Sequence, residues 1–366
     1  MKTKACGICL APGDSINHLD HLAPIALFMG IPMVVDEEFL IGMMKTYYPQ
    51  VETIFIDHHA KILEYLAQNY DYLFCSCANY RASLSPLLEV IFRKKMQFWY
   101  CNHGHSDKSV EHFKYQNLAF VYGDHMQESL EKGKYLDQME GYVRTGNYRF
   151  SFYKKFEIFY DEIVEKEIFS HFTKKQKTIL YAPTWDDLES STSFFDVTHS
   201  IIDQLPSHYN LIVKLHPWLM HYTAGQVHHL EEKYRDHSNV QILGLYPLTL
   251  PILKRTDIYL GDFSSISYDF LYYNRPMFFF EGSKRIKERM SSSHIHQCGT
   301  VIPPNFYDAI YPFIEKNLPD QKEKEPLRTQ LYHHAFGEEK PFDLLKQEVE
   351  EVIASLGLGD KAISNS

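Results

Sequence analysis

The stretch TDIYLGDFSSISYDFLYYNRPMFFF, residues 256–280, carries the pattern of a strand, a tight turn, a helix and a second strand. Its first run is rich in β-forming residues, and Gly261 allows a sharp turn. Ser264 or Ser265 can cap a helix, and the Asn-Arg-Pro triplet that starts at Asn274 ends it. This order predicts a β–α–β unit of a parallel sheet.

The turn in this stretch also predicts a site for an anion. The first amides of a helix have no partner within the helix and lie at the positive end of its dipole. The hydroxyls of Ser264 and Ser265 add further donors, so a diphosphate suits this position. A serine-capped crossover helix that binds nothing is the alternative that this segment alone leaves open.

Length and composition indicate a two-domain globular protein. A chain of 366 residues is longer than one that usually folds around a single hydrophobic core. Its content of 45% hydrophobic and 15% aromatic residues excludes a disordered chain. The formal net charge of −10 argues against nucleic acid as a partner. Because the apolar stretches are too short or interrupted to span a bilayer and no signal peptide is recognisable, we expect a cytoplasmic protein.

The residues that commonly bind metals give no consistent metal site. The six cysteines lie mostly in apolar, strand-like runs, where we expect reduced, buried thiols. Asp57, His58 and His59 resemble a phosphoesterase metal motif, but no Asp-x-Asp precedes them, so we expect Asp57 to cap a helix with the histidines exposed. The other closely spaced histidine pairs, which lack a third ligand, are His18 with His21 and His103 with His105. We therefore predict no metal and no cofactor.

Strand and helix patterns alternate along the whole chain, which predicts parallel sheets covered by helices. A first series of strands is predicted at residues 5–10, 31–35, 53–56, 72–75, 96–101 and 118–122. A second series is predicted at residues 178–182, 211–215, 240–243, 257–260 and 277–280. We expect a first Rossmann-like domain over residues 1–150, a second over residues 151–345, and a helix end with a flexible tail over residues 346–366.

Polar side chains gather where four of these strands end. His103 follows one strand and Thr184 another, Lys214 and His216 lie at the end of a third, and Asp262 follows the fourth. Ligands of open parallel sheets bind at the carboxyl ends of the strands. A lone histidine at such an end is more often structural, but this combination favours a cleft between two facing sheets that holds a nucleotide diphosphate and an acceptor.

Four segments of the C-terminal half form a signature of a known family. They are LYAPTWDD at residues 180–187, VKLHP at 213–217, LYPLTLPILKRTDIYLGDFSSISYDF at 245–270 and the RPMFFFE that follows. In order and spacing they resemble the CDP-glycerol glycerophosphotransferases of teichoic acid synthesis, sharply over residues 180–281 and faintly over 98–149. The resemblance implies an α/β fold of the glycosyltransferase B type, with the donor nucleotide in the C-terminal of two Rossmann-like domains that face a cleft.

The same resemblance implies roles for single residues. His103, before Gly104, matches the histidine that is the proposed general base, and His216 matches the second essential histidine, which contacts the donor phosphates. Besides these two catalytic residues, we predict donor-binding residues at Lys214, Asp262, Ser264, Ser265, Thr184 and Arg149.

The chain departs from the family pattern in two places. Tyr148 stands where the family has proline before the arginine that Arg149 matches. Residues 105–108, His-Ser-Asp-Lys, replace the usual Thr-Pro-Leu-Lys after the histidine, so the acceptor side can differ from that of a teichoic acid polymerase.

The resemblance implies a transferase that moves glycerol phosphate from CDP-glycerol to a lipid-linked glycan or polyol phosphate acceptor and releases CMP. A glycosyltransferase with a nucleotide-sugar donor and a catalytically silent nucleotide-binding module are the alternatives. Arg93, Lys94 and Lys95 lie between Phe92 and Met96, which suits either weak peripheral contact with the inner face of the membrane or a solvated basic turn.

Overall fold

The computed structural model describes residues 4–10, 16–107, 109–185, 192–281 and 294–356, and it divides the chain into two compact units. The first unit combines Met1–His103, Ser109–Lys154 and His334–Ser366. The second combines Gly104–Lys108 and Lys155–His333. The predicted border near residue 150 lies close to the one observed at Lys154, but the prediction kept residues 334–345 with the second domain, whereas their contacts belong to the first unit.

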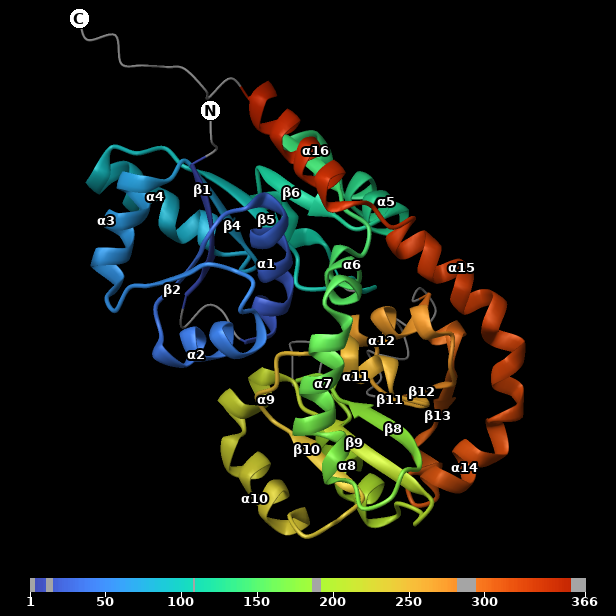
Figure 1. The fold of residues 1–366 in the computed structure, drawn as a ribbon. Coiled ribbons are helices and arrows are strands. Elements are labelled where there is room, and N and C mark those ends of the chain that lie inside the picture. Colours follow the sequence, from blue (N-terminus) through green and yellow to red (C-terminus); the bar gives the residue numbers. More distant parts are fainter. Residues whose placement is uncertain (1–3, 11–15, 108, 186–191, 282–293, 357–366) are drawn as a thin grey trace, which may run out of the picture. The chain divides into compact units, whose positions relative to one another are not determined.

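The first unit contains a seven-stranded sheet in the order β3-β2-β1-β4-β5-β6-β7, of which Figure 1 labels β1, β2, β4, β5 and β6. Its strands are β1 (Ala5–Cys9), β2 (Met33–Val35), β3 (Thr53–Phe55), β4 (Tyr72–Cys75), β5 (Gln97–Cys101), β6 (Leu118–Val121) and β7 (Gly141–Arg144). Every neighbouring pair is parallel. β1, β4, β5 and β6 are buried along their whole length, as apolar strands covered on both faces should be.

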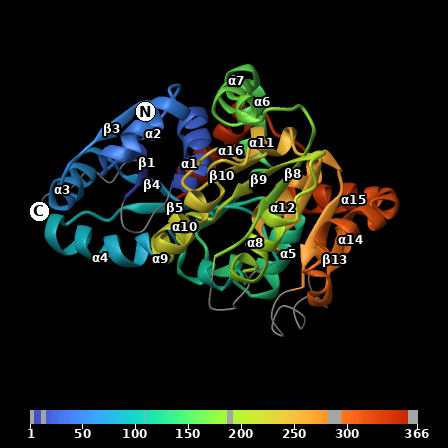
Figure 2. The same ribbon diagram turned by 90° about the horizontal axis from the view of Figure 1, so that it is seen from below.

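Helices connect the strands of the first unit, and α3 and α4 lie side by side (Figure 1, Figure 2). The helices of this unit are α1 (Ile16–Met29), α2 (Glu38–Tyr47), α3 (His59–Asn69), α4 (Tyr80–Phe92), η1 (Glu111–Tyr115), α5 (Asp124–Lys132), η2 (Leu136–Gln138), α6 (Tyr148–Lys155) and α16 (Phe342–Ser355). The expectation that Asp57 caps α3 is wrong. His58 is the N-cap, because its Nδ1 accepts a hydrogen bond from the Ala60 amide at 3.2 Å.

The C-terminal helix α16 packs against α1 and β7 of the first unit. The rings of Phe342 and Phe28 lie 5.6 Å apart, and Leu345 and Val349 are fully buried. A side chain at Gly141 on β7 would lie 2.5 Å from Val352 Cγ1, so the absence of a side chain there lets α16 approach the strand. The first unit is therefore completed by residues that follow the whole second unit. Of the predicted helix end and tail at 346–366, residues 357–366 lie outside the described residues.

The second unit contains a six-stranded parallel sheet in the order β10-β9-β8-β11-β12-β13. Its strands are β8 (Lys177–Ala182), β9 (Tyr209–Lys214), β10 (Val240–Leu243), β11 (Ile258–Gly261), β12 (Met277–Phe280) and β13 (Thr300–Ile302). Its helices are α7 (Glu157–Glu167), η3 (Phe169–His171), α8 (Phe194–Asp203), α9 (Pro217–Tyr222), α10 (Ala224–Tyr234), α11 (Leu250–Lys254), α12 (Ser265–Phe270), η4 (Leu271–Tyr273), η5 (Ile295–Cys298), η6 (Pro304–Phe306), α14 (Ile310–Asn317), η7 (Pro319–Lys324) and α15 (Glu325–Phe336), whose last residues belong to the first unit.

Two parallel sheets with helices confirm the predicted α/β class. All six cysteines are free thiols, and all but the half-buried Cys77 are buried, as predicted. Across the described ranges, no helix has both the length and the apolar character needed to cross a bilayer.

Candidate functional site

The carboxyl edge of the second sheet brings together most of the predicted donor-binding residues. β9, β8 and β11 are adjacent and parallel, so the residues that follow them emerge at the same edge. Neighbouring strands lie about 4.8 Å apart, which puts the end of β9 roughly 10 Å from the end of β11. This is the span over which a nucleotide diphosphate could make contacts with both.

His216 follows β9 and caps α9. Its Nδ1 accepts a hydrogen bond from the Trp218 amide at 3.2 Å, and Pro217 occupies the first turn, where its missing N–H costs nothing. Since Nδ1 is an acceptor here, a neutral imidazole must carry its hydrogen on Nε2. The cap therefore leaves His216 with an Nε2–H donor.

Lys214 is the last residue of β9 and is 4% exposed. Its Nζ donates to the carbonyl oxygen of Tyr246 at 2.9 Å. An ammonium group has three donors and a fixed positive charge, so a buried lysine at a strand end is a suitable partner for phosphate oxygens.

The serine turn, defined as Ser264 and Ser265, joins β11 to α12. Ser264 stands at the N-cap with an extended backbone, but its hydroxyl makes no capping hydrogen bond and lies 3.3 Å from the Tyr259 hydroxyl. Ser265 is the first residue of the helix, and the Ser267 amide donates to the Ser264 carbonyl. The predicted cap position is thus confirmed, whereas side-chain capping by Ser264 is not observed.

Asp262 holds the segment that follows β8. Its Oδ2 accepts hydrogen bonds from the amides of Thr184 at 2.8 Å and Ser193 at 3.1 Å, and its side chain is buried. The Thr192 hydroxyl in turn donates to the Thr184 carbonyl at 2.8 Å. Asp262 and Thr184 therefore contact each other at the site edge, and their predicted contact with a donor stays a prediction.

An aromatic group formed by Trp185, Trp218 and Tyr222 lies beside His216. The ring centroids of Trp185 and Trp218 are 5.8 Å apart, and Tyr222 stacks on both at 5.9 and 5.3 Å. The Trp185 ring also lies 6.3 Å from that of His216. This aromatic group was not predicted from the sequence. It places an apolar surface beside the hydrogen-bond donors at the carboxyl edge of the sheet.

In the first unit, His103 follows β5 and its side chain is exposed. Its ring centroid lies 4.7 Å from that of the buried His18 on α1. Asn102, the preceding residue, accepts a hydrogen bond at its carbonyl from the Tyr122 hydroxyl at 2.8 Å. The rings of His103 and His18 are therefore neighbours within the first unit.

His21, one turn after His18 on α1, is fully enclosed. Its Nδ1 lies 3.2 Å from the Tyr122 hydroxyl. Burial lowers the pKa of His21 well below its ordinary value, and the positive charge of Arg149 adds to this effect. His21 is therefore neutral at pH 7 and serves packing and hydrogen bonding in this unit.

Arg149 lies on α6, 4% exposed, and its Nη2 donates to Asp20 Oδ2 at 2.5 Å. Asp20 Oδ1 also accepts a hydrogen bond from the Tyr48 hydroxyl at 3.2 Å. This buried ion pair ties α6 to α1 within the first unit. The donor contact predicted for Arg149 stays a prediction.

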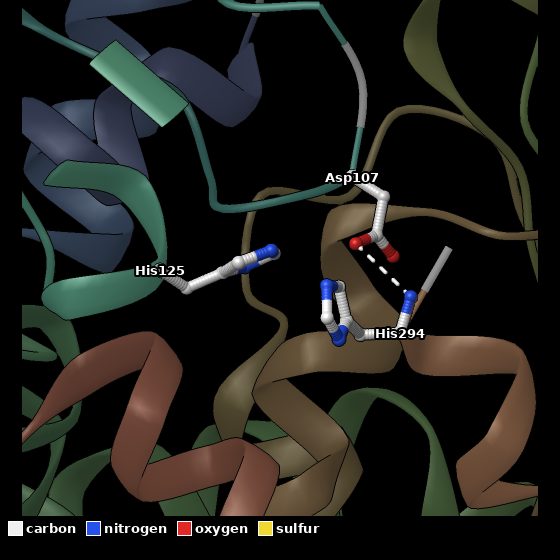
Figure 3. A group of neighbouring side chains, drawn as sticks. All are labelled: Asp107, His125 and His294. Atoms are coloured by element: carbon white, nitrogen blue, oxygen red, sulfur yellow. Dashed lines mark hydrogen bonds between the residues drawn. The ribbon is translucent and has the colours of Figure 1, made fainter. Parts of the chain in front are cut away.

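Residues 104–107, which contain most of the segment that departs from the family pattern after His103, belong to the second unit. His105 is buried, and its ring meets Tyr268 of α12 edge-on at 4.7 Å. Asp107 accepts hydrogen bonds from the amides of His294 and Ile295 at 3.3 Å each, the first of them drawn in Figure 3. Burial, and then the Asp107 carboxylate, raise the pKa of the Tyr268 phenol.

Comparison with known proteins gives likenesses of sequence and of fold. Residues 153–285 match the sequence model of the family described as CDP-Glycerol:Poly(glycerophosphate) glycerophosphotransferase. The teichoic acid glycerol-phosphate primase of Bacillus subtilis (strain 168) is 31% identical over 108 residues, 29% of this chain. That match spans 26%, about a quarter, of the length of the primase.

Solved structures share the fold over nearly the whole chain. The wall teichoic acid polymerase TagF has a TM-score of 0.66 at 13% identity, with 97% of this chain and 91% of that chain covered. A UDP-N-acetylglucosamine 2-epimerase from Listeria monocytogenes, described as putative in its source, has a TM-score of 0.60 at 11% identity, with 100% and 99% covered. The predicted fold of the glycosyltransferase B type is thus confirmed. Residues 153–285, the stretch that matches the model of the CDP-glycerol:poly(glycerophosphate) glycerophosphotransferase family, include the serine turn and the ends of β8 and β9.

Proposed function

We propose that this protein transfers glycerol phosphate from CDP-glycerol to a hydroxyl acceptor and releases CMP. The observation that carries the proposal is the convergence of Lys214, His216 and the serine turn at one sheet edge, inside the stretch that matches the family. The B. subtilis relative is named as a teichoic acid glycerol-phosphate primase, and a TagF variant was solved after a soak with CDPG, which supports the choice of donor.

In this proposal, the donor diphosphate binds at the carboxyl edge of the second sheet. His216 donates through Nε2–H, Lys214 supplies positive charge, and the serine turn supplies hydroxyl and helix amide donors. Because the cap on α9 and the strand end fix these groups in advance, they stabilise the charge that develops on the leaving CMP. A preorganised donor of this kind is typically worth about 10² to 10³ in rate.

His103 acts as the general base. The acceptor oxygen forms a bond to the phosphorus that bears glycerol, the bond from that phosphorus to the CMP oxygen breaks, and the electron pair leaves with CMP. The proton of the acceptor hydroxyl passes to His103, whose exposed ring beside His18 suits this task. General-base catalysis of this kind contributes about 10² to 10⁴ in rate.

We further propose a lipid-linked glycan or polyol phosphate as the acceptor, at the inner face of the membrane. The support is that the named relatives are a teichoic acid primase and a wall teichoic acid polymerase. The changed residues after His103 set this chain apart from the family on the side of the general base. Its acceptor therefore need not be the polymer end that a polymerase extends.

Calorimetric titration of the purified protein with CDP-glycerol tests the donor, with CDP, CMP, UDP-GlcNAc and GDP-mannose as controls. Binding of CDP-glycerol and CDP, but not of the uridine and guanosine compounds, is the expected result. Binding of only a uridine or guanosine donor would identify a glycosyltransferase instead. No binding of any nucleotide would leave a catalytically silent module.

A further inference from the structure

The outer face of α4 exposes three large apolar side chains. Leu87 is 43% exposed, Val90 71% and Ile91 59%. Their spacing of three and four residues places them on one face of the helix, within an arc of roughly 100°. A helix on the surface of a globular protein normally turns a polar face to water, so this face is unusual.

Other exposed large apolar residues occur singly in the part of the chain that the structure describes. Ile158 on α7 is the most exposed of them at 77%, and it has no second such residue on its helix. Single exposed apolar residues are common on soluble proteins, whereas contiguous ones mark an interaction surface.

The opposite side of α4 anchors the helix firmly in the first unit. Leu88 is fully buried in the apolar core of this unit, and the Tyr80 hydroxyl donates to the Leu10 carbonyl at 2.5 Å. Leu87, Val90 and Ile91 are not members of that core. The exposed face formed by these three residues therefore does not contribute to the core that stabilises the first unit.

Positive charge accompanies this face. Residues 80–95 contain four basic residues and one acidic residue, a local net charge of +3 in a chain of net charge −10. Arg93 ends α4 in the left-handed conformation, with φ of 54°, and both Arg93 and Lys95 are exposed next to the apolar face. Lys94, between them, pairs with Asp71. An apolar face with adjacent basic side chains complements a bilayer surface that carries anionic headgroups.

We infer that α4 is a membrane-docking surface. Leu87, Val90 and Ile91 enter the boundary between headgroups and acyl chains, while Arg93 and Lys95 contact anionic headgroups. This inference does not depend on the proposed reaction, because it concerns the bilayer itself. If both hold, α4 keeps the enzyme at the surface where a lipid-linked acceptor would lie.

Flotation of the full chain with lipid vesicles, without donor or acceptor, tests the inference. We expect the protein to float with vesicles of phosphatidylcholine mixed with phosphatidylglycerol at about 0.1 M NaCl, and less with phosphatidylcholine alone or at about 1 M NaCl, where charges are screened. The triple variant Leu87→Ser, Val90→Ser, Ile91→Ser should lower the partition coefficient by about tenfold or more. The matched control Ile158→Ser, which removes the most exposed single apolar side chain, should bind as the wild type does.

A second variant, Arg93→Ser with Lys95→Ser, should bind both kinds of vesicle equally and weakly. Thermal unfolding of each variant at the wild-type temperature would show that the fold is intact. Failure of the wild type to float with anionic vesicles, or wild-type flotation of the triple variant, would overturn the inference. A concentration-dependent dimer in light scattering that only the triple variant loses, with no vesicle binding, would identify a second copy of the chain as the occupant of this face.

Discussion

At the scale of single residues, His216 has two roles that different substitutions can separate. It caps α9 through Nδ1 and it offers an Nε2–H at the sheet edge. His216→Ala should lower the free energy of unfolding by about 0.5–2 kcal/mol, because the cap is lost. It should also lower turnover by about 10² or more, because the donor is lost.

His216→Asn is the matched variant, since asparagine caps helices well but has no imidazole. We expect near wild-type thermal stability and the same loss of CMP release as in His216→Ala. Wild-type turnover in His216→Asn would show that only the cap matters and would remove His216 from the proposed chemistry.

The serine turn gives a prediction about binding. Replacing Ser264 and Ser265 together with alanine should raise the Kd for CDP-glycerol by about tenfold or more, because hydrogen bonds to a charged partner are each worth about 1.5–3 kcal/mol. Calorimetry measures this directly. Ser207→Ala is the control, because Ser207 is exposed just before β9, at the opposite edge of the same sheet. An unchanged Kd in the double variant would mean that the turn only starts the helix.

The positions of single candidate residues in the fold were largely predictable, and their hydrogen-bond partners were not. A polar residue directly after a buried strand points to the carboxyl edge, which is how His103, His216 and the serine turn were identified. The contacts by which Asp262 holds the segment after β8 could not be predicted from the sequence, because the amides that its carboxylate binds lie 69 and 78 residues away along the chain. Hydrogen bonds over such separations leave no local pattern.

At the scale of elements, the contact between β8 and β11 depends on Gly261. A side chain at this position would lie 2.6 Å from the Ala182 carbonyl oxygen, closer than atoms can approach. Gly261→Ala should therefore push the strands apart next to Asp262, lower the free energy of unfolding by about 1–3 kcal/mol and weaken donor binding.

Gly225→Ala is the matched control for this prediction. Gly225 lies in α10, and a side chain there would meet nothing within 4 Å. Alanine favours a helix over glycine, so this variant should unfold at the same or a higher temperature. Equal stability of the two variants in thermal denaturation would contradict the proposed crowding at Gly261.

Central strands were predicted well because their residues are apolar on both faces. β4 and β12, which lie inside their sheets, have the predicted bounds, and so has the edge strand β10. β7 and β13 were not predicted, since they are short strands at the edges of their sheets, with the sequences GYVR and TVI and several partly exposed residues. Their pairing partners, not their own composition, make them strands.

At the scale of the whole molecule, the packing of α16 on the first unit gives a prediction from two neighbouring leucines. Leu345 is fully buried and Leu344 is 41% exposed. Leu345→Ala should lower the free energy of unfolding of the first unit by about 2–5 kcal/mol, and Leu344→Ala should change it by less than about 1 kcal/mol. Calorimetric unfolding, with transitions assigned by nucleotide binding to the second unit, measures both. Similar losses in the two variants would contradict the packing of α16 described above.

Local sequence patterns could not predict that the chain returns to the first unit after residue 333. Periodicity finds a helix at the C-terminal end but does not say which sheet it covers. The order of the elements suggests that consecutive helices stay together, and residues 334–355 are an exception because Gly141 admits α16 beside β7.

This return also affects the order of folding during synthesis. β7 ends at Arg144 and α16 ends at Ser355, about 210 residues later. At about 5–20 residues per second, a ribosome needs roughly 10–40 s to make that interval. During this interval all seven strands of the first sheet have been synthesised, but the surface that α16 covers is still exposed. The second unit leaves the ribosome in the same interval and can fold. Although it begins the chain, the first unit is the last to be finished.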